Sequence, residues 1–230
     1  MLRHQMVTHG SRNTLNESAW MSEAQLGGTE RGTERIEAFS DGVFAIAITL
    51  LILEIKIPHL QSGSNLFSSL LDLWPAYFGY VLSFVMIGIY WANHHYIFKL
   101  FRKTNHALNL LNLLFLLFIA FLPLPTAVLG DYLLDPTNQT TAVTVYALGL
   151  LFPAATWLLM WLYASGRYRI VDTSLDAGYL RRLTLQYIGS VAAYLGAVVV
   201  SLIDFRWGLT ICVGLTLLYL LPPKRPVYHR

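Results

Sequence analysis

The sequence predicts an all-α, polytopic membrane protein with six transmembrane helices. Of its 230 residues, 55% are hydrophobic and only 13% are charged, whereas soluble domains carry about 25% charged residues. The apolar residues fall into six runs that are separated by polar, charged or proline-containing segments. The formal net charge is only +3, and the cations lie between the apolar runs, which indicates membrane loops rather than a nucleic-acid-binding surface.

The first predicted helix covers residues 35–57 and reads RIEAFSDGVFAIAITLLILEIKI. About 20 residues are enough to cross a hydrocarbon core as a helix, and Pro58 with the polar loop behind it is expected to end this one. Asp41 lies near its start. An ionisable group inside a transmembrane helix is costly, which makes this carboxylate a candidate for function.

The first helix has two unlike faces when its residues are placed at about 100° intervals. One face is mostly apolar with one hydroxyl group and contains Arg35, Phe39, Gly42, Ile46, Thr49, Leu50 and Leu53. The other face contains Glu37, Ser40 and Asp41. The polar face needs hydrogen-bond partners from other helices, so the helix is predicted to contact two different environments.

The second and third helices are predicted over residues 74–90 and 107–129. The second begins with Trp74, Tyr77 and Tyr80, which suit the aromatic belt of a membrane interface. It can extend through the sequence WANHHYIF to residue 98, where basic residues begin a loop. An acidic, turn-rich segment follows the third helix.

The last three helices are predicted over residues 141–163, 183–203 and 207–221. Pro153 is expected to kink the fourth helix, and the sixth is short because Pro222 and Pro223 stop it. The cations concentrate after helices two and four and at the C-terminus: Lys99, Arg102, Lys103, Arg167, Arg169, Arg181, Arg182, Lys224, Arg225 and Arg230. The positive-inside rule therefore predicts that both termini lie in the cytoplasm, with six spans. We expect a multi-pass protein of the cell membrane.

This pattern divides the chain into three parts. Residues 1–34 are rich in Ser, Thr, Asn, Gly and charge and are predicted to form a mostly disordered cytoplasmic tail. Residues 35–221 form the transmembrane domain, and residues 222–230 form a short basic cytoplasmic tail.

Asp41 requires hydrogen-bond donors, and the predicted topology brings several polar side chains to its level. They lie at the end of the second helix and the start of the third: Trp91, Asn93, His94, His95, Asn109 and Asn112. Two compatible interpretations are open. The group is a structural clasp that joins the first three helices, or it is a proton-linked or gating site, because histidine titrates near neutral pH.

Several other classes of site lack their sequence signals. His94 and His95 are adjacent, so they point in different directions on a helix, and no Cys/His/Asp cluster completes a metal site. No catalytic motif or nucleotide-binding loop appears in its required context, so we expect neither an enzyme nor a cofactor. The TVGYG sequence of carbonyl-lined potassium filters is also missing.

The motif formed by Arg35, Phe39, Ser40, Asp41 and Gly42 resembles the RxxxFSDG signature of the transmembrane protein 175 potassium channel family, and the WxxHH pattern from Trp91 to His95 is also similar. This resemblance implies a homotetramer with one six-helix unit per chain, in which the first helix lines a central pore. By position from the motif, the pore constriction would be formed by Ile46 with Leu50 and Leu53 beyond it, and Thr49 would add a hydroxyl group nearby.

The expected function is therefore a potassium-permeable cation channel. Its hydrophobic constriction would provide gating and a modest preference for K⁺ over Na⁺, with the lipid bilayer and monovalent cations as its other partners and no nucleic acid. One alternative is a proton-coupled secondary transporter or a proton-permeable channel that uses Asp41 and the histidines of the second helix. A membrane enzyme or a purely structural membrane protein is a further alternative.

Overall fold

The computed structural model describes residues 33–59, 65–166, 170–221 and 226–228. The first helix is α-helical over residues 33–50 and tightens into the 3₁₀ turn η1 (Leu51–Glu54). The other helices are α2 (Leu66–Leu71), α3 (Trp74–Phe98), α4 (His106–Phe121), α5 (Pro123–Tyr132), α6 (Gln139–Ser165), α7 (Ala177–Ser201) and α8 (Phe205–Tyr219). The all-α prediction is confirmed.

Five helical stretches of the described chain are long and apolar enough to cross a membrane. They are Thr33–Glu54, Leu66–Phe98, His106–Tyr132, Gln139–Ser165 and Ala177–Ser201. The sixth apolar helix, α8, has 15 residues and is about 22 Å long, which is shorter than a hydrocarbon core of about 30 Å. The protein is thus a multi-pass membrane protein, and its described residues contain five apolar helices of full spanning length and one shorter one.

The structure differs from the sequence prediction where helices break. The third predicted helix is two helices, α4 and α5, which meet at Leu122 because Pro123 and Pro125 cannot continue the hydrogen-bond ladder. The carbonyl of Leu122 accepts bonds from the backbone nitrogen and the Oγ1 atom of Thr126 instead. The first helix ends at Glu54 rather than at residue 57, and α2 was not predicted. Asn65 caps α2 by accepting a bond from Phe67.

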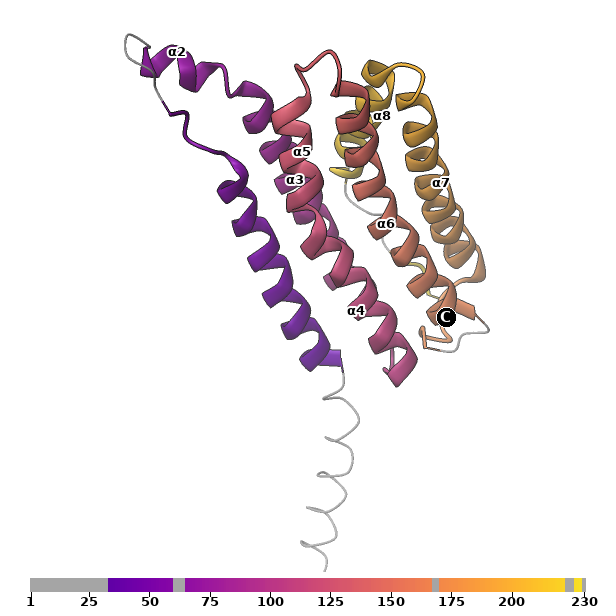
Figure 1. Ribbon diagram of the computed structural model, residues 1–230. Coiled ribbons are helices and arrows are strands. Elements are labelled where there is room, and N and C mark those ends of the chain that lie inside the picture. The colour runs from indigo at the N-terminus through magenta and orange to yellow at the C-terminus, as the bar shows by residue number, and fades with distance from the viewer. Residues whose placement is uncertain (1–32, 60–64, 167–169, 222–225, 229–230) are drawn as a thin grey trace, which may run out of the picture.

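Helix α6 lies at the centre of the bundle and packs against α4, α5, α7 and α8. Its Gly149 allows a close approach to α5, since a Cβ atom there would lie 2.6 Å from the Cγ atom of Pro125. In Figure 1 the first helix lies at the opposite side of the bundle from α7 and α8. It contacts α3 and α5 through η1, and one of its sides is exposed in the described chain at Ile46, Leu50 and Leu53.

The loops at one end of the bundle are tied together by short backbone pairings. Arg102 donates to the carbonyl of Ile170, and Asp172 donates to that of Leu100. Donation from the backbone and hydroxyl of Ser174 holds the pKa of Asp172 below its usual value. Basic residues of the described chain gather at this end: Arg35, Lys99, Arg102, Lys103, Arg181 and Arg182.

The predicted terminal tails fall largely outside the described residues. Residues 33 and 34, which were assigned to the N-terminal tail, belong to the first helix. Of the C-terminal segment, residues 226–228 lie against the start of α7, where Asp176 donates to the carbonyl of Val227 and Leu175 pairs with Tyr228.

Candidate functional site

The first helix presents one packed face and one exposed face. Ser40, Phe44, Ala47 and Leu51 are spaced by four, three and four residues, and each is at most 1% exposed. This is the spacing of a single helical stripe. The packed stripe fixes how the helix is rotated, and therefore which residues its opposite face exposes.

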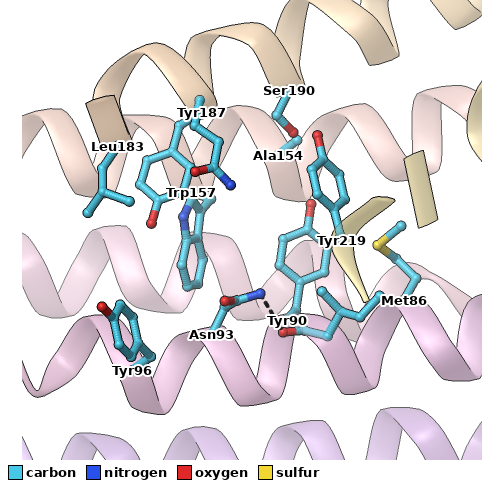
Figure 2. A pocket seen from close by; sticks show the side chains of 12 residues that line it. Met86, Tyr90, Asn93, Tyr96, Ala154, Trp157, Leu183, Tyr187, Ser190 and Tyr219 are labelled. Atoms are coloured by element: carbon cyan, nitrogen blue, oxygen red, sulfur yellow. Dashed lines mark hydrogen bonds between the residues drawn. The ribbon is translucent and has the colours of Figure 1, made fainter. Parts of the chain in front are cut away.

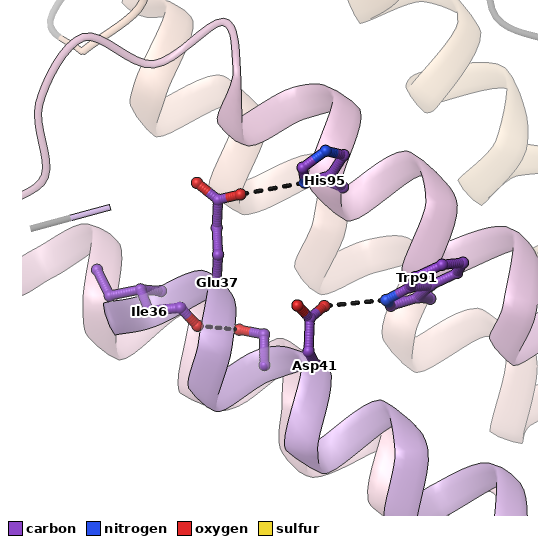
Figure 3. Close-up of polar contacts among 6 residues, drawn as sticks. Ile36, Glu37, Asp41, Trp91 and His95 are labelled. Carbon is purple, nitrogen blue, oxygen red and sulfur yellow. Dashed lines mark hydrogen bonds and ion pairs between the residues drawn. The ribbon is translucent and has the colours of Figure 1, made fainter. Parts of the chain in front are cut away.

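Two polar contacts connect the start of the first helix to the end of α3 (Figure 3). The indole nitrogen Nε1 of Trp91 donates to the Oδ1 atom of Asp41 at 2.9 Å. The Nδ1 atom of His95 lies 3.2 Å from the Oε2 atom of Glu37. Asp41 and His95 are both exposed in the single chain, so these contacts lie at the side of the first helix rather than in the core.

A second set of contacts lies deeper and forms a chain of hydrogen bonds. His94 is 2.9 Å from the Oδ1 atom of Asn112, and the Nδ2 atom of Asn112 donates to the hydroxyl of Ser40 at 3.0 Å. Ser40 in turn donates to the carbonyl of Ile36 at 2.7 Å. Because an amide oxygen only accepts, Nε2 of His94 is the donor. The chain joins α3, α4 and the first helix.

The imidazole of His94 is held between aromatic rings. It is 1% exposed and stacks on Phe98 with ring centroids 4.3 Å apart. Phe44 of the first helix meets it edge-on at 5.5 Å, and Phe115 of α4 lies at 6.2 Å. A side chain packed this closely has a fixed orientation, which positions Asn112 and, through it, Ser40. The aromatic residues of this site were not predicted, because their sequence signal is only that of ordinary core residues.

Three of the polar residues singled out in the sequence lie apart from these contacts. Asn93 is on another side of α3, where its Nδ2 atom donates to the carbonyl of Ile89. The Oδ1 atom of Asn109 is buried and has no hydrogen-bond partner among the described residues. Arg35 is exposed and makes no ion pair within the described part of the chain.

The exposed face of the first helix carries the residues assigned to the constriction. Ile46 is 60% exposed, Leu50 42% and Leu53 70%, while Gly42 and Thr49 are also exposed. The Thr49 hydroxyl donates to the carbonyls of its own helix at residues 45 and 46, at 2.9 Å. The hydroxyl proton of Thr49 is therefore used within the helix, and its oxygen can still accept a hydrogen bond.

The polar and aromatic contacts fix the rotation of the first helix, and its apolar stripe is exposed on the opposite side. The described residues contain no group of three or more His, Cys, Asp or Glu side chains that could hold a metal ion. The exposed apolar stripe of Ile46, Leu50 and Leu53 is the part of the site that the single chain leaves uncovered.

Comparison with known proteins places the chain among channels. The profile of a family described as "Endosomal/lysosomal potassium channel TMEM175" matches residues 35–123. A protein of Chamaesiphon minutus named potassium channel Cha6605_3372 is 41% identical over 191 residues, which cover 82% of this chain and 94% of that protein. A human protein named endosomal/lysosomal proton channel TMEM175 is 35% identical over 136 residues, 54% of this chain and 27% of the human one.

The fold also matches a solved channel structure. The crystal structure of a lysosomal potassium-selective channel TMEM175 homolog from Chamaesiphon minutus superimposes with a TM-score of 0.74 at 39% identity. The match covers 82% of this chain and 96% of that one. The resemblance therefore includes the whole helical bundle and not the first helices alone.

Proposed function

This chain belongs to the TMEM175 family, and from that membership we propose that four copies of it form a potassium-permeable cation channel in the cell membrane. Each copy contributes its first helix to a central pore. The relative and the solved structure that resemble it over more than four fifths of its length are both named as potassium channels.

One structural observation supports this function most directly. Ile46, Leu50 and Leu53 form an exposed apolar stripe on a helix whose other face is packed and hydrogen-bonded to α3 and α4. In a tetramer with the first helices around a common axis, four such stripes would meet and make a narrow apolar passage. Neighbouring copies would then cover a surface that the single chain leaves open.

Conduction through such a passage depends on dehydration rather than on backbone carbonyls. The first helix stays α-helical past Ile46, so its carbonyls are engaged in the helix and cannot form a carbonyl-lined filter. An ion must lose part of its hydration shell among the apolar side chains, and a dry constriction closes the path. Potassium loses its water more easily than sodium does, so the passage favours potassium. Without a ring of carbonyls to replace the lost water, this preference for K⁺ over Na⁺ is modest.

The polar contacts of the first helix have a supporting role in this mechanism. They fix the first turns against α3 at Glu37 and Asp41 and against α4 at Ser40. A change in these contacts would shift or rotate the whole stripe. These contacts of Glu37, Ser40 and Asp41, which we call the clasp, therefore couple the position of the constriction to changes outside the pore.

Proton permeation is the second function that we consider, because a human relative is named as a proton channel. The pair of Glu37 and the 57%-exposed side chain of His95 supports it. Both side chains are ionisable, and they meet where the first helix contacts α3. A proton-coupled carrier has less support, because the relatives named above are named as channels.

Planar-bilayer recording of the purified protein tests both functions. With KCl on one side and NaCl on the other, we expect unitary current steps and a reversal potential displaced toward the potassium equilibrium potential. A pH gradient in symmetrical KCl then moves the reversal potential only if protons permeate. Flux without unitary steps, saturable and dependent on a second solute, would identify a carrier and reject the channel.

A further inference from the structure

A cavity lies among α3, α6, α7 and α8, on a different side of α3 from the first helix (Figure 2). Its volume is about 60 Å³, whereas one water molecule needs only about 10–15 Å³. The space therefore suits several waters or one small organic molecule. It belongs neither to the clasp nor to the exposed stripe of the first helix.

The lining combines apolar walls with hydroxyl and amide groups. Trp157 and Met86 supply flat and flexible apolar surface, and the hydroxyl ends of Tyr90, Tyr219 and Ser190 point toward one another. The described residues that line the cavity include no acidic or basic side chain. A charged ligand would stay unpaired in such surroundings, which is costly, whereas a neutral polar one finds partners.

Two amide side chains complete the lining. The Nδ2 atom of Asn93 donates to the carbonyl of Ile89 at 3.0 Å, which leaves its Oδ1 atom to accept a bond from a guest. Gln186 of α7 is exposed and brings a second neutral amide to the lining.

We propose that this cavity is a binding site for small uncharged alcohols, with the hydroxyl group bonded among the tyrosine and amide side chains and the short carbon skeleton against Trp157. A hydroxyl is the group that fits best, because it donates to Asn93 Oδ1 and accepts from a tyrosine at once. A volume of about 60 Å³ suits a short-chain alcohol.

The site has a route to the first helix through α3. Residues 90, 93 and 96 line the cavity, while Trp91 and His95 of the same two turns hold Asp41 and Glu37. An alcohol bound against one side of this segment therefore acts on the clasp at the other. This part of the proposal rests on the proposed channel function.

Photolabelling tests the binding site independently of conduction. The full chain in phosphatidylcholine vesicles is irradiated with a diazirine derivative of butanol, and adducts are located by mass spectrometry. We expect adducts on Tyr90, Tyr187 or Tyr219 that saturate with concentration and fall at least fivefold in excess 1-butanol. Adducts that are absent there, or that 1-butanol does not displace, overturn the site.

A matched pair of variants on α7 sharpens this test. Ser190→Phe fills the cavity, whereas Ala192→Phe adds the same ring at an exposed position outside the lining. Adducts should be lost in the first variant and kept in the second; equal labelling in both overturns the site. If Ser190→Phe does not fold, Ala154→Leu fills the cavity from α6.

Currents with and without 1-butanol test the route to the pore. The wild type and Ala192→Phe should respond, and Ser190→Phe should not. An equal response in all three assigns the effect to the bilayer and overturns the route, while the labelling result still decides the binding site.

Discussion

Trp91 donates a 2.9 Å hydrogen bond to Asp41, and one turn away His95 lies 3.2 Å from Glu37. Each pair of partners on one helix is four residues apart, so the two contacts form the rungs of a ladder between antiparallel helices. The first turns of the first helix are thus fixed at two heights by side chains. This ladder leads to a direct test of coupling.

Trp91→Phe removes the donor and keeps an aromatic ring, and Asp41→Ala removes the acceptor. We expect each to lower the melting temperature of the detergent-solubilised protein by a few degrees, which corresponds to about 1 kcal/mol. The double variant should be little worse than either single one, because both remove the same bond. The control is Trp74→Phe at the other end of α3, and fully additive losses would show that the two residues do not interact.

Asn112→Leu should destabilise the protein more than Asn109→Leu, although the residues lie one turn apart. Asn112 bonds to His94 and Ser40, so its loss leaves the buried Nε2 donor of His94 without a partner, at a cost of about 1–3 kcal/mol, and also removes the bond to Ser40, which keeps its bond to the carbonyl of Ile36. The Oδ1 atom of Asn109 has no such partner within the described residues. Thermal unfolding of the two variants in parallel checks this, and equal losses would argue against the hydrogen-bond chain.

Both termini are expected in the cytoplasm, because basic residues gather at the end of the bundle where the first helix starts. A reporter that is active only outside the cytoplasm should be silent when fused after Arg230. The same reporter inserted between α5 and α6 should be active. A strong signal from the C-terminal fusion would refute the six-helix topology.

Much of the fold follows from the sequence because the bilayer restricts the choices. Every spanning segment must be an apolar helix, so the six runs and their polar boundaries locate the bundle. The break at Leu122 is visible in the sequence only as Pro123 and Pro125, and kinked and broken helices share that signal. The 3₁₀ turn at Leu51–Glu54 depends on packing against α3 and α5, which no local pattern contains.

The candidate site is predictable in its residue types but not in its pairings. Placing residues at 100° intervals around the first helix separates Asp41 from Ile46. It does not show which of Trp91, His94 and His95 is the partner of the carboxylate. That choice depends on how α3 is rotated, which the core residues decide: His94 packs among phenylalanines and faces inward, so Trp91 and His95 face the first helix. The same rotation turns Asn93 toward the cavity.

The last prediction concerns the constriction itself. Ile46→Ala should raise conductance and weaken the discrimination between K⁺ and Na⁺, because it widens the narrowest ring without removing a hydrogen bond. Ile46→Asn should wet the passage and favour open states. The measurement is the reversal potential under bi-ionic conditions, compared with wild type at equal yield of the assembled protein.

A position outside the pore behaves differently, and Ile188 offers the comparison. It is a 45%-exposed isoleucine on α7, whereas Ile46 is 60% exposed on the first helix. If Ile46 faced lipid, both Ile46→Ala and Ile188→Ala would leave the reversal potential unchanged. If Ile46 were a packing residue, its truncation would cost about 2–5 kcal/mol of stability and would not alter the selectivity. Cysteines at 46, 50 and 53 should also react with permeant thiol reagents. Inert cysteines together with an unchanged reversal potential would remove the first helix from the pore.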